Sequence, residues 1–88
     1  MSKYSPLREF LLNQDKQYVK LTFEEIEDII GSNLSKSAYT YRPWWANDKY
    51  HVQATNGWLA AGYKVKEVDF ENRIVIFEKE GHFFESKQ

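Results

Sequence analysis

The hydrophobic and polar positions near the N-terminus follow first a helical and then an extended period. Apolar residues recur at helical spacing after Ser5-Pro6, a pair that suits a helix start, and the pattern ends within 13–15. Over 17–21, apolar and polar residues alternate instead, which indicates a half-buried strand. The sequence therefore predicts a helix followed by a short strand.

The start of the second helix is the strongest local signal in the chain. Thr22 and Glu25 have the spacing of a capping box, in which each side chain accepts a hydrogen bond from the backbone N–H of the other residue. Leu21 and Ile26 flank it at the positions of a hydrophobic staple. Gly31 stands where a left-handed C-cap is expected, so we expect the helix to end there.

Two further helical segments are expected in the middle of the chain. A short turn is expected over 35–39, and a longer helix over about 48–61, capped by Asn47 or Asp48. One face of the longer helix is apolar and carries Tyr50, Ala54, Trp58 and Ala61. Gly57 inside this helix costs about 1 kcal/mol relative to Ala, so we expect a kink or a local irregularity there.

The C-terminal part of the chain has the pattern of a β-hairpin. Strand-like segments cover 63–70 and 73–79, and turn-forming residues separate them. Val65 and Val68 are out of phase for a strict period of two, which predicts a β-bulge in the first of these strands.

Together these elements predict a single small α+β domain over 1–79, with the element order α-β-α-α-β-β. The C-terminal β-hairpin should pair with the first strand in a three-stranded antiparallel sheet, so the expected fold is winged-helix-like. Residues 80–88 are expected to form a tail, in which Phe83 and Phe84 are candidates for docking on the domain. The expected core includes Ile26, Trp58, Val75 and Phe77.

Composition limits the chemistry that this chain can perform. Its 88 residues include no cysteine, which excludes disulfides, thiolate metal sites and cysteine nucleophiles. The sequence has neither an apolar run of membrane-spanning length nor the h-region of a signal peptide. We therefore expect a cytoplasmic protein with no membrane partner.

Candidate catalytic groups are few. Only His51 and His82 could act as imidazole bases, and neither lies in a nucleophile signature. Asp48 and His51 are three residues apart and could share a helix face, but two residues do not complete a metal site. Asp48 as a helix N-cap is the simpler interpretation. We expect no enzyme activity, no cofactor, no metal and no small-molecule substrate.

Positive charge and aromatic residues gather in the same part of the chain. Residues 36–66 carry five Lys and Arg side chains against Asp48 alone, a net charge of +4, whereas the whole chain has a net charge of −1. Within this part, 39–62 holds three Trp and three Tyr residues. Rings with a polar tip form both cores and contact surfaces, and local positive charge suggests an anionic partner.

These features favour a non-enzymatic domain that binds nucleic acid, and DNA in particular, through an aromatic and basic surface. The candidate contact residues are Arg42, Trp45, Asn47, Lys49, His51, Gln53, Asn56, Lys64 and Lys66. We favour the 48–61 helix as the recognition element because it precedes the hairpin. The competing element is a helix-turn-helix over 23–41 that exposes Lys36, Tyr39 and Arg42, although Glu27 lies where crossing helices need a small residue.

A protein–protein interaction module is the alternative. A regulatory subunit, a phage-type inhibitor or a homodimer would use Trp, Tyr and Arg side chains as binding hot spots. The small net charge of the whole chain fits this class better than it fits strong DNA binding, which needs several phosphate contacts.

The three tryptophans have different expected environments. Trp44 and Trp45 are adjacent in an irregular segment, so we expect one in the core and the other partly exposed. An exposed Trp beside Arg42 could stack on a base or on an aromatic partner. Trp58 lies on the apolar face of its predicted helix and is expected in the core.

Several segments of the chain resemble one family of small uncharacterised prokaryotic proteins and domains. The resemblance covers roughly 4–79 and is most specific in the sequences WWAND and GWLAAG, at 44–48 and 57–62. The chain departs from the family at Ser35, where a proline is frequent, and in its acidic tail. The resemblance implies a shared fold and carries no activity or mechanism.

Overall fold

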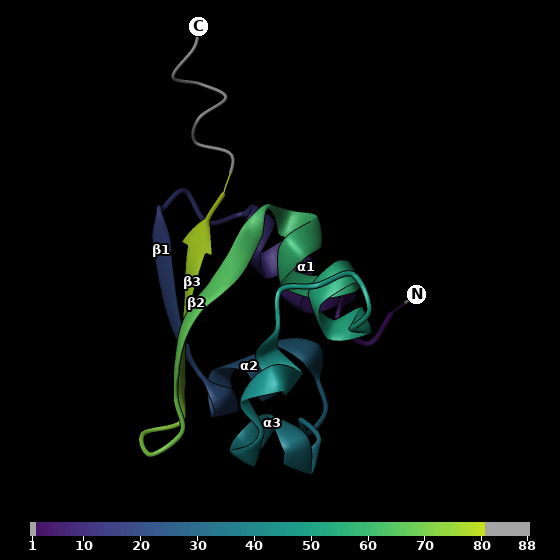
Figure 1. Ribbon diagram of the computed structural model, residues 1–88. Helices are drawn as coiled ribbons and strands as arrows, with labels where there is room; N and C mark the ends of the chain where they lie inside the picture. The colour runs from purple at the N-terminus through teal and green to yellow at the C-terminus, as the bar shows by residue number, and fades with distance from the viewer. Residues whose placement is uncertain (1, 81–88) are drawn as a thin grey trace, which may run out of the picture.

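A three-stranded antiparallel sheet with helices gathered on one side of it forms the body of the protein (Figure 1). The computed structural model describes residues 2–80. In chain order the elements are α1 (Ser5–Leu12), β1 (Tyr18–Thr22), α2 (Phe23–Ile30), α3 (Lys36–Thr40), the 3₁₀ turn η1 (Arg42–Trp45), the π-helical turn η2 (Ala54–Trp58), the 3₁₀ turn η3 (Leu59–Ala61), β2 (Tyr63–Asp69) and β3 (Ile74–Lys79). The predicted α+β class, the C-terminal hairpin and the order of elements are confirmed.

The sheet has the strand order β1-β3-β2, so the C-terminal strand is central. β1 pairs with β3 from Tyr18 opposite Glu78 to Thr22 opposite Ile74. The hairpin register shifts between Val65 and Glu67, which confirms the predicted bulge in β2. The pairing between the hairpin and the first strand was expected from the sequence and is confirmed.

The predicted start and end of α2 are both present. The Thr22 hydroxyl accepts from the Glu25 backbone N–H at 2.9 Å, and the Glu25 carboxylate accepts from the Thr22 N–H at 2.8 Å. Gly31 follows the helix with φ 75°, the left-handed conformation that a residue without a Cβ adopts most easily.

The helix predicted over about 48–61 starts later than expected, at Val52, and it is irregular, as Gly57 indicated. The chain forms a tight turn at 48–50, then the π-helical turn η2 and the 3₁₀ turn η3. Gly57 marks the irregularity that its residue type predicted, and it is buried against the start of α1, where a Cβ would make van der Waals contact with the Tyr4 Cβ at 3.5 Å. Because no regular helix carries it, Tyr50 leaves the predicted buried face and is 80% exposed.

The core lies between the inner face of the sheet and the helices. All four residues predicted to be core are at most 1% exposed: Ile26, Trp58, Val75 and Phe77. They belong to one cluster of buried side chains. The helices α1, α2 and α3, the turns η1, η2 and η3 and all three strands contribute to it. Phe83 and Phe84, which were predicted to dock on the domain, lie outside the described residues, as does His82. No helix within 2–80 is long and apolar enough to cross a membrane.

Trp58 tests the core most directly. Its side chain is fully buried and its indole N–H donates to the Asn47 side-chain oxygen at 3.0 Å. We expect Trp58→Ala to lower the free energy of unfolding by about 3–5 kcal/mol, the cost of truncating a large buried ring, as measured by chemical denaturation. Trp58→Phe keeps most of the ring and should cost less. An unchanged unfolding midpoint in Trp58→Ala would contradict the buried position.

Candidate partner-binding surface

The two adjacent tryptophans divide as the sequence predicted. Trp45 is fully buried, while Trp44 is half-buried and its ring centre lies 6.3 Å from that of Tyr4. The indole N–H of Trp45 donates to the Ala38 carbonyl at 2.9 Å. Of the two, Trp45 was the candidate contact residue. Its ring packs among the aromatic side chains of the core, so it is not available to a partner.

Gln53 is also inside the protein. The side chain is 6% exposed, and its amide N–H donates to the Trp44 carbonyl at 2.8 Å. This hydrogen bond ties the start of the η2 region to η1, so the amide is already engaged by the fold. Gln53, one of the candidate contact residues, is therefore not available at the surface to contact a partner.

Asn47 holds the edge of the sheet. Its side-chain oxygen accepts from the Val65 backbone N–H at 2.8 Å and from the Trp58 indole N–H at 3.0 Å. Its side-chain N–H donates to the Val65 carbonyl at 2.9 Å. β2 is an edge strand and has no neighbouring strand on its outer side. The Asn47 side chain therefore supplies the hydrogen bonds for the Val65 backbone groups that face outward. The amide of Asn47 thus connects the loop after η1, the sheet and the buried Trp58.

The basic candidates do not form one patch. Val65 points into the core, so Lys64 before it projects from the outer face of the sheet, away from the helices, and Lys66, in the bulge, lies on that face beside Tyr18. Lys64 Nζ lies 4.0 Å from carboxylate oxygens of both Glu78 and Glu80. Lys66 Nζ lies 6.0 Å from the centre of the Tyr18 ring. The positive charge predicted for one surface is therefore divided between two faces.

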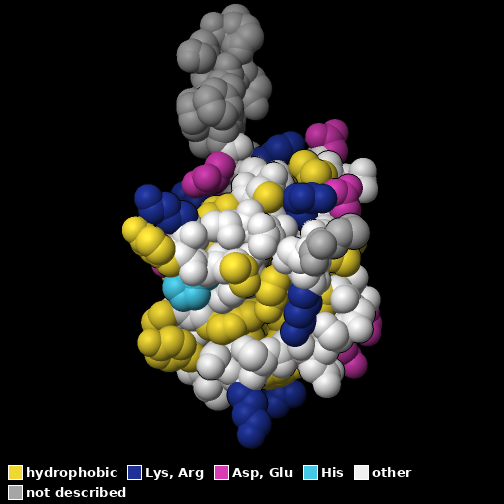
Figure 2. All heavy atoms as spheres, turned by 90° about the vertical axis from the view of Figure 1, so that its right-hand side faces the viewer, with side chains coloured by type: hydrophobic (Ala, Val, Ile, Leu, Met, Phe, Trp, Pro, Cys, Tyr) yellow, Lys and Arg dark blue, Asp and Glu magenta, His cyan; other side chains and the backbone are white. Residues whose placement is uncertain are grey.

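The remaining candidates lie on the helical side, at exposed or half-buried positions of the stretch 41–56, which also contains the buried Trp45 and Gln53. Arg42, Lys49 and Asn56 are exposed there and His51 is half-buried. The same stretch exposes three large hydrophobic side chains that were not among the candidate contact residues: Tyr41 at 58%, Tyr50 at 80% and Val52 at 58%. We call these seven residues the aromatic surface. Figure 2 shows this side of the molecule, with hydrophobic side chains open to solvent and separate Lys or Arg side chains around them.

A hydrogen-bonded turn holds Tyr50 outward. One oxygen of Asp48 accepts from the Tyr50 backbone N–H at 2.9 Å and lies 2.6 Å from His51 Nδ1. The hydrogen bond with His51 lowers the pKa of the Asp48 carboxyl, helped by the one from Tyr50. Lys49 Nζ lies 5.6 Å from the centre of the Tyr50 ring, a cation–π distance. Within the described part of the chain, no group of three or more His, Cys, Asp or Glu residues could hold a metal.

In the competing helix-turn-helix segment, Glu27 has a structural role. The Glu27 carboxylate accepts from the Leu34 backbone N–H at 2.9 Å and from the Tyr39 hydroxyl at 2.6 Å, so it fastens the connection between α2 and α3. The hydrogen bond with Glu27, together with burial, raises the pKa of Tyr39. Lys36 and Arg42 are exposed at opposite ends of α3, which has only five residues.

The fold and its surface define a small α+β domain with an exposed aromatic surface on its helical side. The chain belongs to a family described as a domain of unknown function (DUF7662), whose model matches residues 4–81. This confirms the resemblance to an uncharacterised family found from the sequence. No curated protein and no solved structure matches the chain.

Asn47 and Asn56 provide a matched pair of substitutions. Asn47→Ala would leave the Trp58 indole and both Val65 backbone groups without their partner, so we expect a loss of about 2–4 kcal/mol in the free energy of unfolding. Asn56 is exposed and makes no side-chain hydrogen bond among the described residues. Asn56→Ala should therefore change stability by less than about 0.5 kcal/mol. Equal losses in the two variants, measured by urea denaturation, would contradict the role of Asn47.

Proposed function

We propose that this domain is a non-enzymatic binding module that contacts a protein partner through the aromatic surface. The observation that carries the proposal is the 80% exposure of Tyr50 at the tip of a turn fixed by Asp48. Val52 and Tyr41, both more than half exposed, add apolar area on the same stretch of chain. In this proposal the protein acts in the cytoplasm of a prokaryotic cell, as a regulatory subunit or an inhibitor.

The chemistry of these side chains suits a protein interface. Tyr and Arg are enriched among hot-spot residues because they bury a large area and still satisfy a polar group. The Tyr50 backbone is already held by the Asp48 carboxylate, so less conformational entropy remains to be lost on binding. Lys49 and Arg42 are exposed next to Tyr50 and Tyr41 in the chain, and positive charges beside an interface favour association with an acidic partner.

Nucleic acid is the second candidate, supported by Lys49 over the Tyr50 ring, which resembles a stacking platform with an adjacent cation. The sequence favoured it narrowly, and we rank it second because of where the basic residues lie. Lys64 and Lys66 lie on the other face of the sheet, and Gln53 is buried. Arg42 and Lys49 remain, fewer cations than the several phosphate contacts that DNA binding requires.

The test is a pulldown from the native host that compares the wild type with two alanine variants, each of which truncates an exposed hydrophobic side chain. Tyr50→Ala removes the most exposed aromatic of the surface, whereas Leu12→Ala removes an exposed side chain of α1 outside it. We expect one stoichiometric protein to be retained by the wild type and by Leu12→Ala, and to bind Tyr50→Ala at least about tenfold more weakly, as for a hot-spot residue. Melting curves should be unchanged in both variants.

Nuclease treatment and salt distinguish the two classes of partner. A protein complex built on apolar contacts should survive both, whereas a nucleic-acid complex should weaken steeply between low and moderate salt. Retention of nucleic acid that Arg42→Ala and Lys49→Ala each reduce, with a salt slope lower by about one unit per lost phosphate contact, would overturn the protein proposal.

A further inference from the structure

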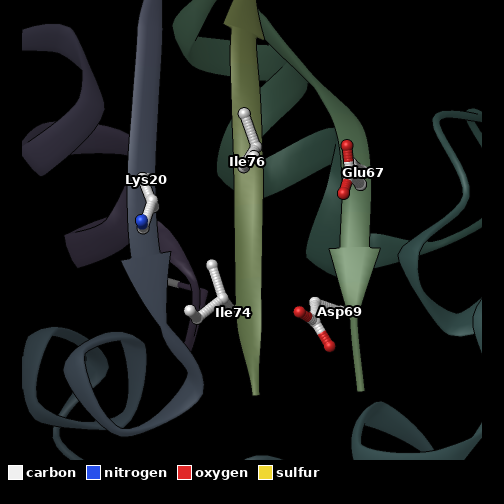
Figure 3. A pocket seen from close by; sticks show the side chains of 5 residues that line it. All are labelled: Lys20, Glu67, Asp69, Ile74 and Ile76. Atoms are coloured by element: carbon white, nitrogen blue, oxygen red, sulfur yellow. The ribbon is translucent and has the colours of Figure 1, made fainter. Parts of the chain in front are cut away.

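The outer face of the sheet carries an ordered pattern of side chains that no helix covers. On the central strand β3, Ile74 and Ile76 are half-buried and point outward beside each other. Figure 3 shows them flanked by Lys20 from β1 on one side and by Glu67 and Asp69 from β2 on the other. Together the five side chains line a shallow hollow of about 120 Å³.

Around Ile76 the outer face carries one cation and one anion, on different strands. The pairing register sets Lys20, Ile76 and Glu67 in one row across the sheet, so a cation and an anion stand on either side of an apolar residue. Lys20 and Glu67 are separated by the whole width of β3, about 10 Å between strand axes. No ion pair joins them within the described residues. Each charge is therefore available to an opposite charge on another molecule.

We propose that this face binds a second copy of the chain, with a two-fold axis that runs along β3 between the two sheets. Such an axis sets each sheet face to face with its copy and places β1 of one molecule over β2 of the other. Lys20 then faces Glu67 of the second copy, and Glu67 faces its Lys20, while Ile76 meets Ile76. The proposal uses a different face from the aromatic surface and goes beyond the proposed function.

The charge pattern selects this axis over the alternative. A two-fold axis across the strands would place β1 over β1 and β2 over β2, so that Lys20 would face Lys20 and Glu67 would face Glu67. Like charges directly opposite each other disfavour association. The axis along β3 instead sets Lys20 and Glu67 of each copy against the opposite charge of the other copy.

The outer rows fit the same arrangement. Tyr18 lies opposite Lys64 in the register across Glu78, and Lys66 already lies over the Tyr18 ring of its own chain. The axis along β3 would set the Tyr18 ring of each copy against the lysines of the other, a cation–π arrangement. Glu78 would approach Glu78 of the second copy. In each copy, however, Lys64 Nζ lies 4.0 Å from the Glu78 carboxylate and offsets its negative charge.

The size of the face sets the expected strength. Three strands of about five residues cover roughly 14 by 17 Å, which is small beside the approximately 800 Å² that each partner buries in a standard interface. We therefore expect a reversible dimer that forms at concentrations on the order of 100 µM, rather than an obligate one. Its ion pairs should weaken as salt rises.

The test is sedimentation velocity of the full chain over a wide concentration range, with charge-reversed variants. Lys20→Glu alone places the new Glu opposite Glu67 at both symmetry-related contacts of the dimer. Glu67→Lys alone likewise places the new Lys opposite Lys20. Each should weaken the dimer by roughly tenfold or more, because two attractive contacts become repulsive. An equimolar mixture of the two variants restores both opposite pairs and should form a heterodimer about as readily as the wild type. Lys36→Glu, the same change on α3, should have no effect.

Ile76→Thr provides a second variant that changes no charge and suits a strand, and it should also weaken the dimer. Circular dichroism and melting curves report whether each variant is folded. A wild type that stays monomeric up to about 1 mM would overturn the proposal. A dimer that neither charge reversal weakens, or that the mixture of variants fails to restore, would overturn it as well.

Discussion

A buried column of aromatic rings joins the helices to the sheet, and the rest of the fold depends on it. Phe23 of α2 stacks on Trp45 with ring centres 5.2 Å apart, and Trp45 stacks on Trp58 at 5.7 Å. Trp58 lies 5.8 Å from Phe77 on β3. Each ring comes from a different element, so their packing fixes the helices against the sheet at one place. Both buried indole N–H groups are hydrogen-bonded, which avoids the cost of about 1–3 kcal/mol for each unpaired group.

This column explains the aromatic density that made 39–62 conspicuous in the sequence. Most of those rings serve the core, and what they leave at the surface is a smaller set led by Tyr50. The turn that exposes Tyr50 lies directly after Asn47, whose amide is held by the sheet edge and by Trp58. The proposed partner-binding residues are therefore positioned by the core itself, so the aromatic surface should be rigid where the turn leaves the body.

The parts of the fold that could be predicted depend on local signals. The capping box at Thr22, the left-handed Gly31 and the bulge between Val65 and Glu67 all involve residues close in sequence, and all were found. In the 48–61 segment the irregularity at Gly57 was expected, whereas the turn over 48–50 was not, because it depends on the side-chain contacts of Asp48 with Tyr50 and His51. The candidate site was predicted only in part. Lys64 and Lys66 lie on the outer face of the sheet, away from the other candidates, and tertiary packing decides which of Trp44 and Trp45 is buried.

Exchange of the three indole N–H protons with solvent, followed by NMR, tests the aromatic column most directly. If Trp45 and Trp58 are locked in the core, their indole protons should exchange only through global unfolding, with protection that falls in parallel as denaturant is added. Trp44, which is half-buried and whose indole N–H has no hydrogen bond among the described residues, should exchange much faster. Exchange of Trp45 and Trp58 as fast as that of Trp44 would contradict the account.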